Sequence, residues 1–223
     1  MGVPSEILFI DKPKGITSFD VVRRLRKKLG MKRMGHAGTL DPFATGLLIV
    51  GVDKGTKRLN EYMSLPKTYL MDVLLGKRTE TGDPEGTVLE KKEVGEIDES
   101  LLEKTLKEME GELTLPIPKY SAVKHKGIPL YAYARKNIPV EEKLRTTRVF
   151  YLKLLDIERQ RKNIILQFEM KAEKGTYARA VAEEIGRRLG LPAMLQDLRR
   201  TKIGDIDVSQ AQKISDQDLG YSQ

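Results

Sequence analysis

The stretch from Asn163 to Ala172 reads Asn-Ile-Ile-Leu-Gln-Phe-Glu-Met-Lys-Ala, and its alternation decides the fold class. From Ile164 onward its apolar residues fall on one face and its polar residues on the other, as in a sheet with one buried face. A second strand is predicted over 148–157, and the short connection through 159–162 makes the two an antiparallel hairpin. Strands and helices mix irregularly elsewhere, so we expect an α+β fold rather than a doubly wound parallel sheet.

Apolar runs and capping residues place the other elements. Strands are expected over 7–10, 47–52, 69–75, 120–126 and 198–203, and helices over 18–29, 56–63, 131–136 and 177–189. Asp98 can cap one more helix. The apolar face of that helix is expected to consist of Leu101, Leu102, Leu106 and Met109. Residues 115–118 are expected to break the regular structure.

The composition limits the class of protein. A chain of 223 residues is long enough for one domain, or for two closely packed halves, with a substantial core. It has no cysteine, which excludes disulfides, thiolate metal ligands and a thiol nucleophile. No apolar run reaches the length of a membrane span, and residues 1–6 do not resemble a secretory signal. We therefore expect a cytoplasmic protein with no membrane partner.

The net charge of +8 favours a polyanionic partner, although charge alone is a weak sign. Its distribution is more informative, because residues 23–33 hold seven cations and no anion. Such a cluster attracts a phosphate backbone. An ordinary solvated helix face has the same composition, so both interpretations stay open.

The next segment, Gly35-His36-Ala37-Gly38-Thr39-Leu40-Asp41-Pro42, sets one carboxylate on a glycine-rich loop. Pro42 biases Asp41 away from helix and toward an extended conformation. Loops held this way often carry chemistry, but they are also common as plain turns. The sequence lacks a phosphate-loop or dinucleotide motif, and His36 and His125 do not form a zinc pattern. We therefore expect neither a cofactor nor a metal.

Two further segments combine cations with turn residues. Residues 118–136 interleave lysines and an arginine with tyrosines, which suits a surface that grips phosphates and stacks bases. Residues 174–179 lie where a strand turns into a helix. Arg179 in that turn can pair with a carboxylate from elsewhere in the fold, although structural ion pairs are as common.

Taken together, these segments resemble the TruB family of tRNA pseudouridine-55 synthases. The matching pieces, in family order, are Ile10-Asp11-Lys12-Pro13-x-Gly15-x-Thr17-Ser18, Gly35-His36-Ala37-Gly38-Thr39-Leu40-Asp41-Pro42, Lys67-x-Tyr69, Gly76-x-x-Thr79-x-Thr81-x-Asp83-x-x-Gly86, Tyr120-Ser121-Ala122, Lys174-Gly175-Thr176-Tyr177-x-Arg179 and Leu198-Arg199-Arg200. They cover most of residues 6–204, and the ordered set is highly specific.

The resemblance implies a pseudouridine synthase catalytic fold: a mixed, mostly antiparallel sheet flanked by helices, with a central RNA-binding cleft. It implies that Asp41 is the essential aspartate, that Tyr69 lies against the target base and that Arg179 pairs with Asp41 and keeps it ionised. His36 would hold the uridine out of its loop, and Tyr177 would line the pocket.

The resemblance also implies a wider set of substrate-binding residues. Besides His36 and Tyr177, these are Leu198, which lines the pocket, and Lys12, Asp83, Lys124 and Arg145.

The same resemblance gives the domain organisation. Residues 1–223 would form one catalytic domain, with a thumb-like insertion at about 116–145 that folds over the RNA. Such an insertion is absent from the archaeal and eukaryotic guide-RNA relatives. Only 23 residues follow Arg200, too few for the C-terminal RNA-binding PUA module that family members usually carry. The expected partner is the T-arm stem-loop of tRNA, bound by a monomer with no obligate protein partner.

The implied reaction flips the target uridine out of its stack, breaks its C1′–N1 bond and joins C1′ to C5. Asp41 can attack C1′, attack C6, or take a proton from the sugar to give a glycal, and the sequence does not choose among the three routes. One rival is a non-catalytic RNA-binding module on the same scaffold, which would have no need of Asp41. The other is a uridine 5-methyltransferase, which needs a cysteine nucleophile that this chain lacks.

Overall fold

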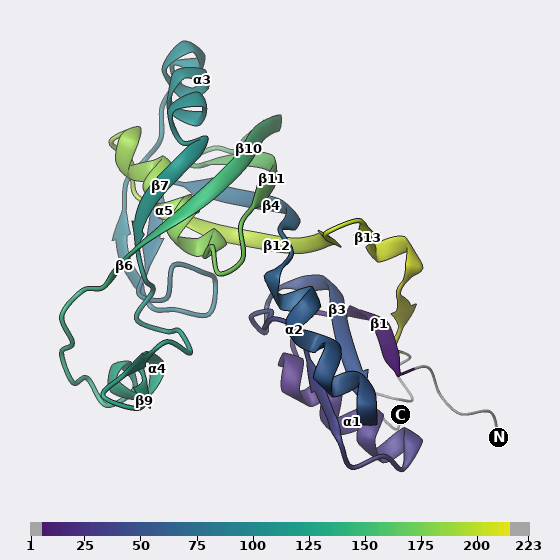
Figure 1. Ribbon diagram of the computed structural model, residues 1–223. Coiled ribbons are helices and arrows are strands. Elements are labelled where there is room, and N and C mark those ends of the chain that lie inside the picture. The colour runs from purple at the N-terminus through teal and green to yellow at the C-terminus, as the bar shows by residue number, and fades with distance from the viewer. Residues whose placement is uncertain (1–5, 215–223) are drawn as a thin grey trace, which may run out of the picture. The chain divides into compact units, whose positions relative to one another are not determined.

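The computed structural model describes residues 6–214 (Figure 1). The ends of the predicted domain, residues 1–5 and 215–223, lie outside this range. The chain divides into two compact units. We call residues 6–70 with 198–214 the terminal unit, and residues 71–197 the central unit. Strands β4 (Lys67–Leu75) and β12 (Ala193–Ile203) run from one unit into the other.

The terminal unit is a small mixed sheet with helices. Its remaining elements are β1 (Ile7–Lys12), α1 (Ser18–Leu29), β2 (Met34–His36), β3 (Thr45–Val52), the 3₁₀ helix η1 (Asp53–Arg58), α2 (Leu59–Ser64), β13 (Ile206–Asp207), η2 (Val208–Gln210) and β14 (Gln212–Lys213). Strand β3 pairs antiparallel with β1 and β2 and parallel with β12. Strand β14 adds to β1 in parallel.

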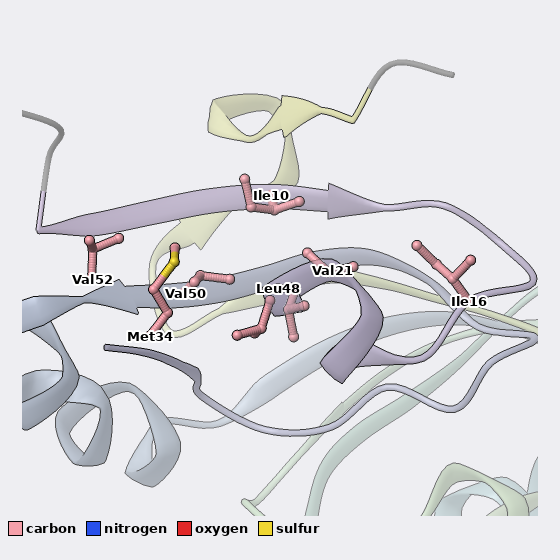
Figure 2. Packing of buried hydrophobic residues seen from close by; sticks show 8 residues of the cluster. Ile10, Ile16, Val21, Met34, Leu48, Val50 and Val52 are labelled. Carbon is pink, nitrogen blue, oxygen red and sulfur yellow. The ribbon is translucent and has the colours of Figure 1, made fainter. Parts of the chain in front are cut away.

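Strand β3 is buried on both of its faces, which explains why residues 47–52 form an unbroken apolar run. On one face, Leu48 and Val50 pack with Ile10 of β1 and Val21 of α1 (Figure 2). On the other face, Leu47 and Ile49 belong to a second cluster. The rest of that cluster is Ala37, Leu59 and Ile203.

Local signals set the limits of α1. Thr17 caps the helix and forms a reciprocal capping box with Asp20, and Gly30 ends it in the left-handed conformation at φ +65°. The basic cluster at 23–33 is partly structural: Arg23 pairs with Asp20 at 2.7 Å, and Arg26 donates to the carbonyl of Met34 at 2.7 Å. Both partners lie just outside residues 23–33. Fewer cations of the cluster therefore remain for an external anion than the sequence suggests.

The central unit is built on the predicted hairpin. It contains β5 (Lys77–Thr79), β6 (Val88–Lys91), α3 (Glu99–Glu108), β7 (Gly111–Pro116), β8 (Lys124–His125), β9 (Ile128–Pro129), α4 (Leu130–Ala134), β10 (Leu144–Arg159), β11 (Ile164–Ala172) and α5 (Ala178–Arg188). Strands β10 and β11 pair antiparallel, with β7 on the far side of β10 and β4 next to β11. Strands β5–β6 and β8–β9 form separate two-stranded sheets.

The apolar–polar alternation of residues 164–172 matches the burial of β11. Leu166, Phe168 and Met170 are fully buried, and their polar neighbours are half-buried. Val181 and Ile185 of α5 are also fully buried in this unit. The prediction of an α+β fold with a mixed sheet flanked by helices is confirmed.

Several local predictions need correction. Residues 111–116 form β7 rather than breaking at 115, because they gain a partner in β10, and the predicted strand over 120–126 shrinks to 124–125. Leu101 is 44% exposed, although Leu102 and Met109 are buried, because α3 buries a narrower stripe than its apolar residues suggest. Between residues 6 and 214, no helix has the length and apolar character to cross a membrane.

Candidate active site

The loop that carries Asp41 lies between β2 and β3, and other elements fix its backbone. The buried hydroxyl of Ser18 donates to the carbonyl of Leu40 at 3.1 Å and accepts from its amide at 2.8 Å. On the other side of Asp41, the carbonyl of Pro42 accepts the amide of Gly15 at 2.8 Å. The backbone is therefore held on both sides, while Asp41 itself is only half-buried.

Arg200 of β12 is the largest fully buried side chain in the described structure, and it bonds to the same loop. Its guanidinium donates to the carbonyl of Gly38 at 3.1 Å, to that of Thr39 at 3.5 Å and to that of Leu47 at 2.8 Å. Arginine suits this task because its donors lie in a rigid fork. Burial lowers the pKa of Arg200, and the electrostatic interaction and hydrogen bond with the Tyr69 side chain oppose that shift. Arg200 thus links the loop to β3 and to Tyr69.

Lys12 is buried, and its assignment to substrate binding stays a prediction. Its side chain is 0% exposed, and its ammonium group donates to the carbonyls of Pro13 (2.9 Å), Ile16 (2.7 Å) and Pro42 (3.2 Å). A buried ammonium group needs such partners because its lost hydration must be replaced. Lys12 therefore joins the β1–α1 connection to the Asp41 loop.

His36 and Tyr69 lie in the same unit as Asp41, and both interact with Arg200. Burial lowers the pKa of His36, with a further decrease from the charge of Arg200. The imidazole is therefore neutral at pH 7. Its Nδ1 is buried and has no hydrogen-bond partner among the described residues. Tyr69 is half-buried near the start of β4, and Leu198, the first residue of β12 in this unit, is 6% exposed.

Arg179 lies at the start of α5 in the central unit and is 4% exposed. Its guanidinium donates to the carbonyl of Thr81 at 2.8 Å and to that of Tyr120 at 2.9 Å. Its ion-pair partner within this unit is Asp83, at 3.7 Å, and both side chains are about 5% exposed. Asp41 belongs to the other unit, so the pairing of Arg179 with Asp41 stays a prediction.

Asp83 is held as firmly as Arg179. Its Oδ1 accepts from the hydroxyl of Thr81 at 2.5 Å and from the amide of Glu85 at 3.0 Å. Glu183 of α5 lies near this pair, and burial raises its pKa although the charges of Arg78 and Arg179 lower it. The assignment of Asp83 to substrate binding stays a prediction. Its observed contacts make it an anchor for Arg179.

Tyr177 belongs to the turn before α5, and Arg145 of β10 donates to the carbonyl of Lys174 in that turn at 3.5 Å. Tyr177 is the half-buried N-cap residue of the helix. The guanidinium of Arg145 lies against Gly175, where a Cβ would come within 2.6 Å of this flexible side-chain end. Lys124 is exposed on β8, inside the predicted insertion. The central unit therefore places Arg145 against the turn that leads to Tyr177 and Arg179.

The supporting roles of Ser18 and Arg200 were not predicted from the sequence. The burial of Arg200 could have been predicted from its position in the strand. Arg200 lies two residues after Leu198, and residues two apart in a strand share one face. A cation at a buried strand position indicates a polar network around it. Within residues 6–214, no group of three or more histidine or carboxylate side chains is arranged to hold a metal ion.

Comparison with known proteins connects this geometry to one family. A family model described as TruB family pseudouridylate synthase, N-terminal domain, matches residues 26–178. The chain is 44% identical over 209 residues to tRNA pseudouridine synthase B of Desulfotalea psychrophila, covering 92% of this chain and 84% of that protein. It is 42% identical to the protein of the same name from Aquifex aeolicus, covering 92% of this chain and 70% of the relative.

Solved structures give the same fold. A Cbf5–Nop10–Gar1 complex contains a chain that matches with a TM-score of 0.70 and 28% identity, over 96% of this chain and 54% of that one. An H/ACA ribonucleoprotein bound to a substrate RNA containing 2′-deoxyuridine matches with a TM-score of 0.68 and 27% identity, over 93% and 50%. The chain therefore spans about half the length of these two proteins.

Proposed function

This chain belongs to the TruB family of pseudouridylate synthases, and we propose that it converts uridine 55 in the T-loop of tRNA to pseudouridine. Isomerisation of uridine in tRNA follows from the family and from relatives that align over most of both chains. The proposal adds the position of the target and the roles of the side chains. It rests above all on Asp41, a half-buried carboxylate on a backbone held by Ser18, Lys12 and Arg200.

The proposed reaction is an internal rearrangement. The C1′–N1 bond of uridine breaks, C1′ bonds to C5 of the turned base, C5 loses its proton and N1 gains one. No oxidant, reductant or added group is needed. The three routes open to Asp41 all require an ionised carboxylate in a fixed place, and all exclude a role for it that is merely structural. A rigid support for that carboxylate costs no reorganisation during the reaction.

The other side chains have supporting roles in this proposal. Tyr69 lies against the target base, and a neutral His36 hydrogen-bonds to RNA while the base is out of its stack. Tyr177 and Leu198 line the pocket, and Arg145, Lys124 and Asp83 contact the substrate. Arg179, predicted to pair with Asp41, keeps that carboxylate charged.

Replacing Asp41 with asparagine tests the central role. The change keeps the shape of the side chain and removes its charge, so tRNA binding should stay within a few-fold of wild type while product formation is lost. Tritium release from an unmodified tRNA transcript carrying 5-tritiated uridine measures the reaction. Asp205→Asn, the same change at an exposed position of the same unit, is the matched control and should react normally. Normal tritium release by Asp41→Asn would refute the assignment and favour the RNA-binding rival.

A transcript with cytidine at position 55 tests the target. It should release no tritium even though uridines remain elsewhere, and sequencing of the wild-type product should place the single pseudouridine at 55. Release from this transcript would show that another position is used. We further expect a cytoplasmic monomer that needs no protein partner, so that activity per chain should not change with enzyme concentration.

A further inference from the structure

A cavity of about 580 Å³ opens on the central unit, away from the residues assigned above. Its walls are the open end of the β5–β6 hairpin and the turn between β10 and β11, and Leu74, Ile165 and Gln196 also line it. Four lysines, Lys77, Lys91, Lys92 and Lys162, line this cavity against a single acid, Glu93. We call it the lysine pocket.

The pocket has a built framework. The amide of Lys92 donates to the carbonyl of Gly76 at 2.9 Å, and the amide of Val94 donates to the carbonyl of Lys162 at 3.0 Å. Gly76 has φ +98°, and a Cβ there would lie 2.7 Å from Oδ1 of Asn163. The two walls are therefore joined by backbone hydrogen bonds and by a close approach that requires glycine.

Two of the lysines form a like-charge pair across strands. Lys77 and Lys91 are directly opposite each other in the β5–β6 ladder, where like charges destabilise a strand pair. In the part of the chain that the structure describes, Lys77, Lys91 and Lys162 form no ion pair. The ammonium group of Lys92 already donates one hydrogen bond, to the carbonyl of Gly190 at 3.2 Å. An isolated two-stranded sheet is marginal, so this repulsion is a cost that a bound anion would remove.

We propose that the lysine pocket binds backbone phosphates of the substrate tRNA. This inference rests on the proposed function for the identity of the polyanion. Lysines attract phosphate oxygens, and the amide side chains of Gln160, Asn163 and Gln196 can donate to the same oxygens. The pocket contains no tyrosine, histidine or phenylalanine, so it has no platform on which a base could stack. Contacts of this kind position the RNA without reading its sequence.

The double variant Lys77→Gln with Lys162→Gln removes two of the charges that have no ion-pair partner. The matched control, Lys104→Gln with Lys107→Gln, removes two exposed charges from α3, outside the pocket. Affinity for an unmodified tRNA transcript is measured across a series of salt concentrations. The slope of log K against log salt should become shallower by about 1.4–1.8 in the pocket variant, at about 0.7–0.9 per lost phosphate contact, and stay unchanged in the control.

Two further measurements separate the possible explanations. At saturating tRNA the pocket variant should form pseudouridine at the wild-type rate, because the Asp41 loop is untouched. At low salt its thermal midpoint should equal or exceed that of wild type, because a repulsive pair is gone. An unchanged salt slope would overturn the inference. The inference would also be overturned if the pocket variant lost affinity for inorganic phosphate but kept its affinity for tRNA, because the pocket would then be a site for small anions. If the wild-type protein formed no pseudouridine, the proposed function would be refuted instead. The salt dependence of tRNA binding would still test whether the lysine pocket binds phosphates.

Discussion

Gly46→Ala tests the support of the Asp41 loop most directly. Gly46 lies on β3 opposite Arg200 of β12, with φ +103°. A Cβ at this position would lie 2.3 Å from the carbonyl oxygen of Arg200 and 2.8 Å from its nitrogen, both of which are backbone atoms of a paired strand. The strands must therefore separate where Arg200 reaches the loop.

The magnitude follows from two costs. A side chain at this φ costs about 1–3 kcal/mol in backbone strain. Forcing a methyl group into packed structure costs about 1–3 kcal/mol more. Gly111→Ala is the matched control, because Gly111 has φ +92° but a Cβ there meets nothing within 4 Å. For a chain of this size the extra cost at Gly46 should lower the thermal midpoint by about 2–4 °C per kcal/mol, or roughly 2–12 °C beyond the control.

The functional result should separate the two variants more clearly. A displacement of about 1 Å near reacting groups lowers a rate on the order of 100-fold, so Gly46→Ala should lose most tritium release at a temperature where it remains folded. Gly111→Ala should react near the wild-type rate. Equal midpoints and equal rates for both variants would refute the argument that β12 supports the loop through this close approach.

Three further predictions follow from individual side chains. Lys12→Met should destabilise the protein by about 1–3 kcal/mol and lower kcat more than it changes KM, because the carbonyls that the ammonium group serves lose their donor. Denaturant unfolding and steady-state kinetics measure these effects, and a change in KM alone would instead favour the predicted substrate contact. Burial holds the pKa of His36 below its ordinary 6.5, so at acidic pH the unfolded chain binds more protons than the folded chain, and the free energy of unfolding should fall as pH drops below about 6.5. His36→Gln should flatten this part of the profile of stability against pH, and an unchanged profile would contradict the pKa shift. Arg179→Lys keeps the charge but loses the rigid guanidinium that donates to the carbonyls of Thr81 and Tyr120, so tritium release should fall sharply while tRNA affinity stays unchanged. Wild-type activity in this variant would show that the positive charge alone is sufficient.

Much of the fold could be predicted because its signals are local. The capping residues Thr17 and Gly30 set the limits of α1, and the alternation after Asn163 set β11 and its buried face. The missed strand β7 shows the limit of this reasoning. Residues 115–116 contain a proline and read as irregular, but pairing with β10 extends the strand to Pro116.

In the candidate site, too, local features could be predicted from the sequence and long-range contacts could not. The identity of the carboxylate came from a contiguous motif around Asp41. The supports of that carboxylate come from residues that are distant in the chain: Ser18 is 22 positions from Leu40, and Arg200 is 162 positions from Gly38. The burial of Lys12 could not be predicted either, because the carbonyl of Pro42 that its ammonium group serves is 30 positions away in the chain.

The sequence by itself determined the family, the α+β class and the loop that carries the proposed reactive carboxylate, because each of these depends on neighbouring residues and their spacing. Only the tertiary structure decided which polar side chains face inward to hold that loop and which lysines gather around an open pocket. The physical reason is that the burial of a charge depends on partners from other strands. Those partners are set by strand pairing, which joins residues far apart in the chain.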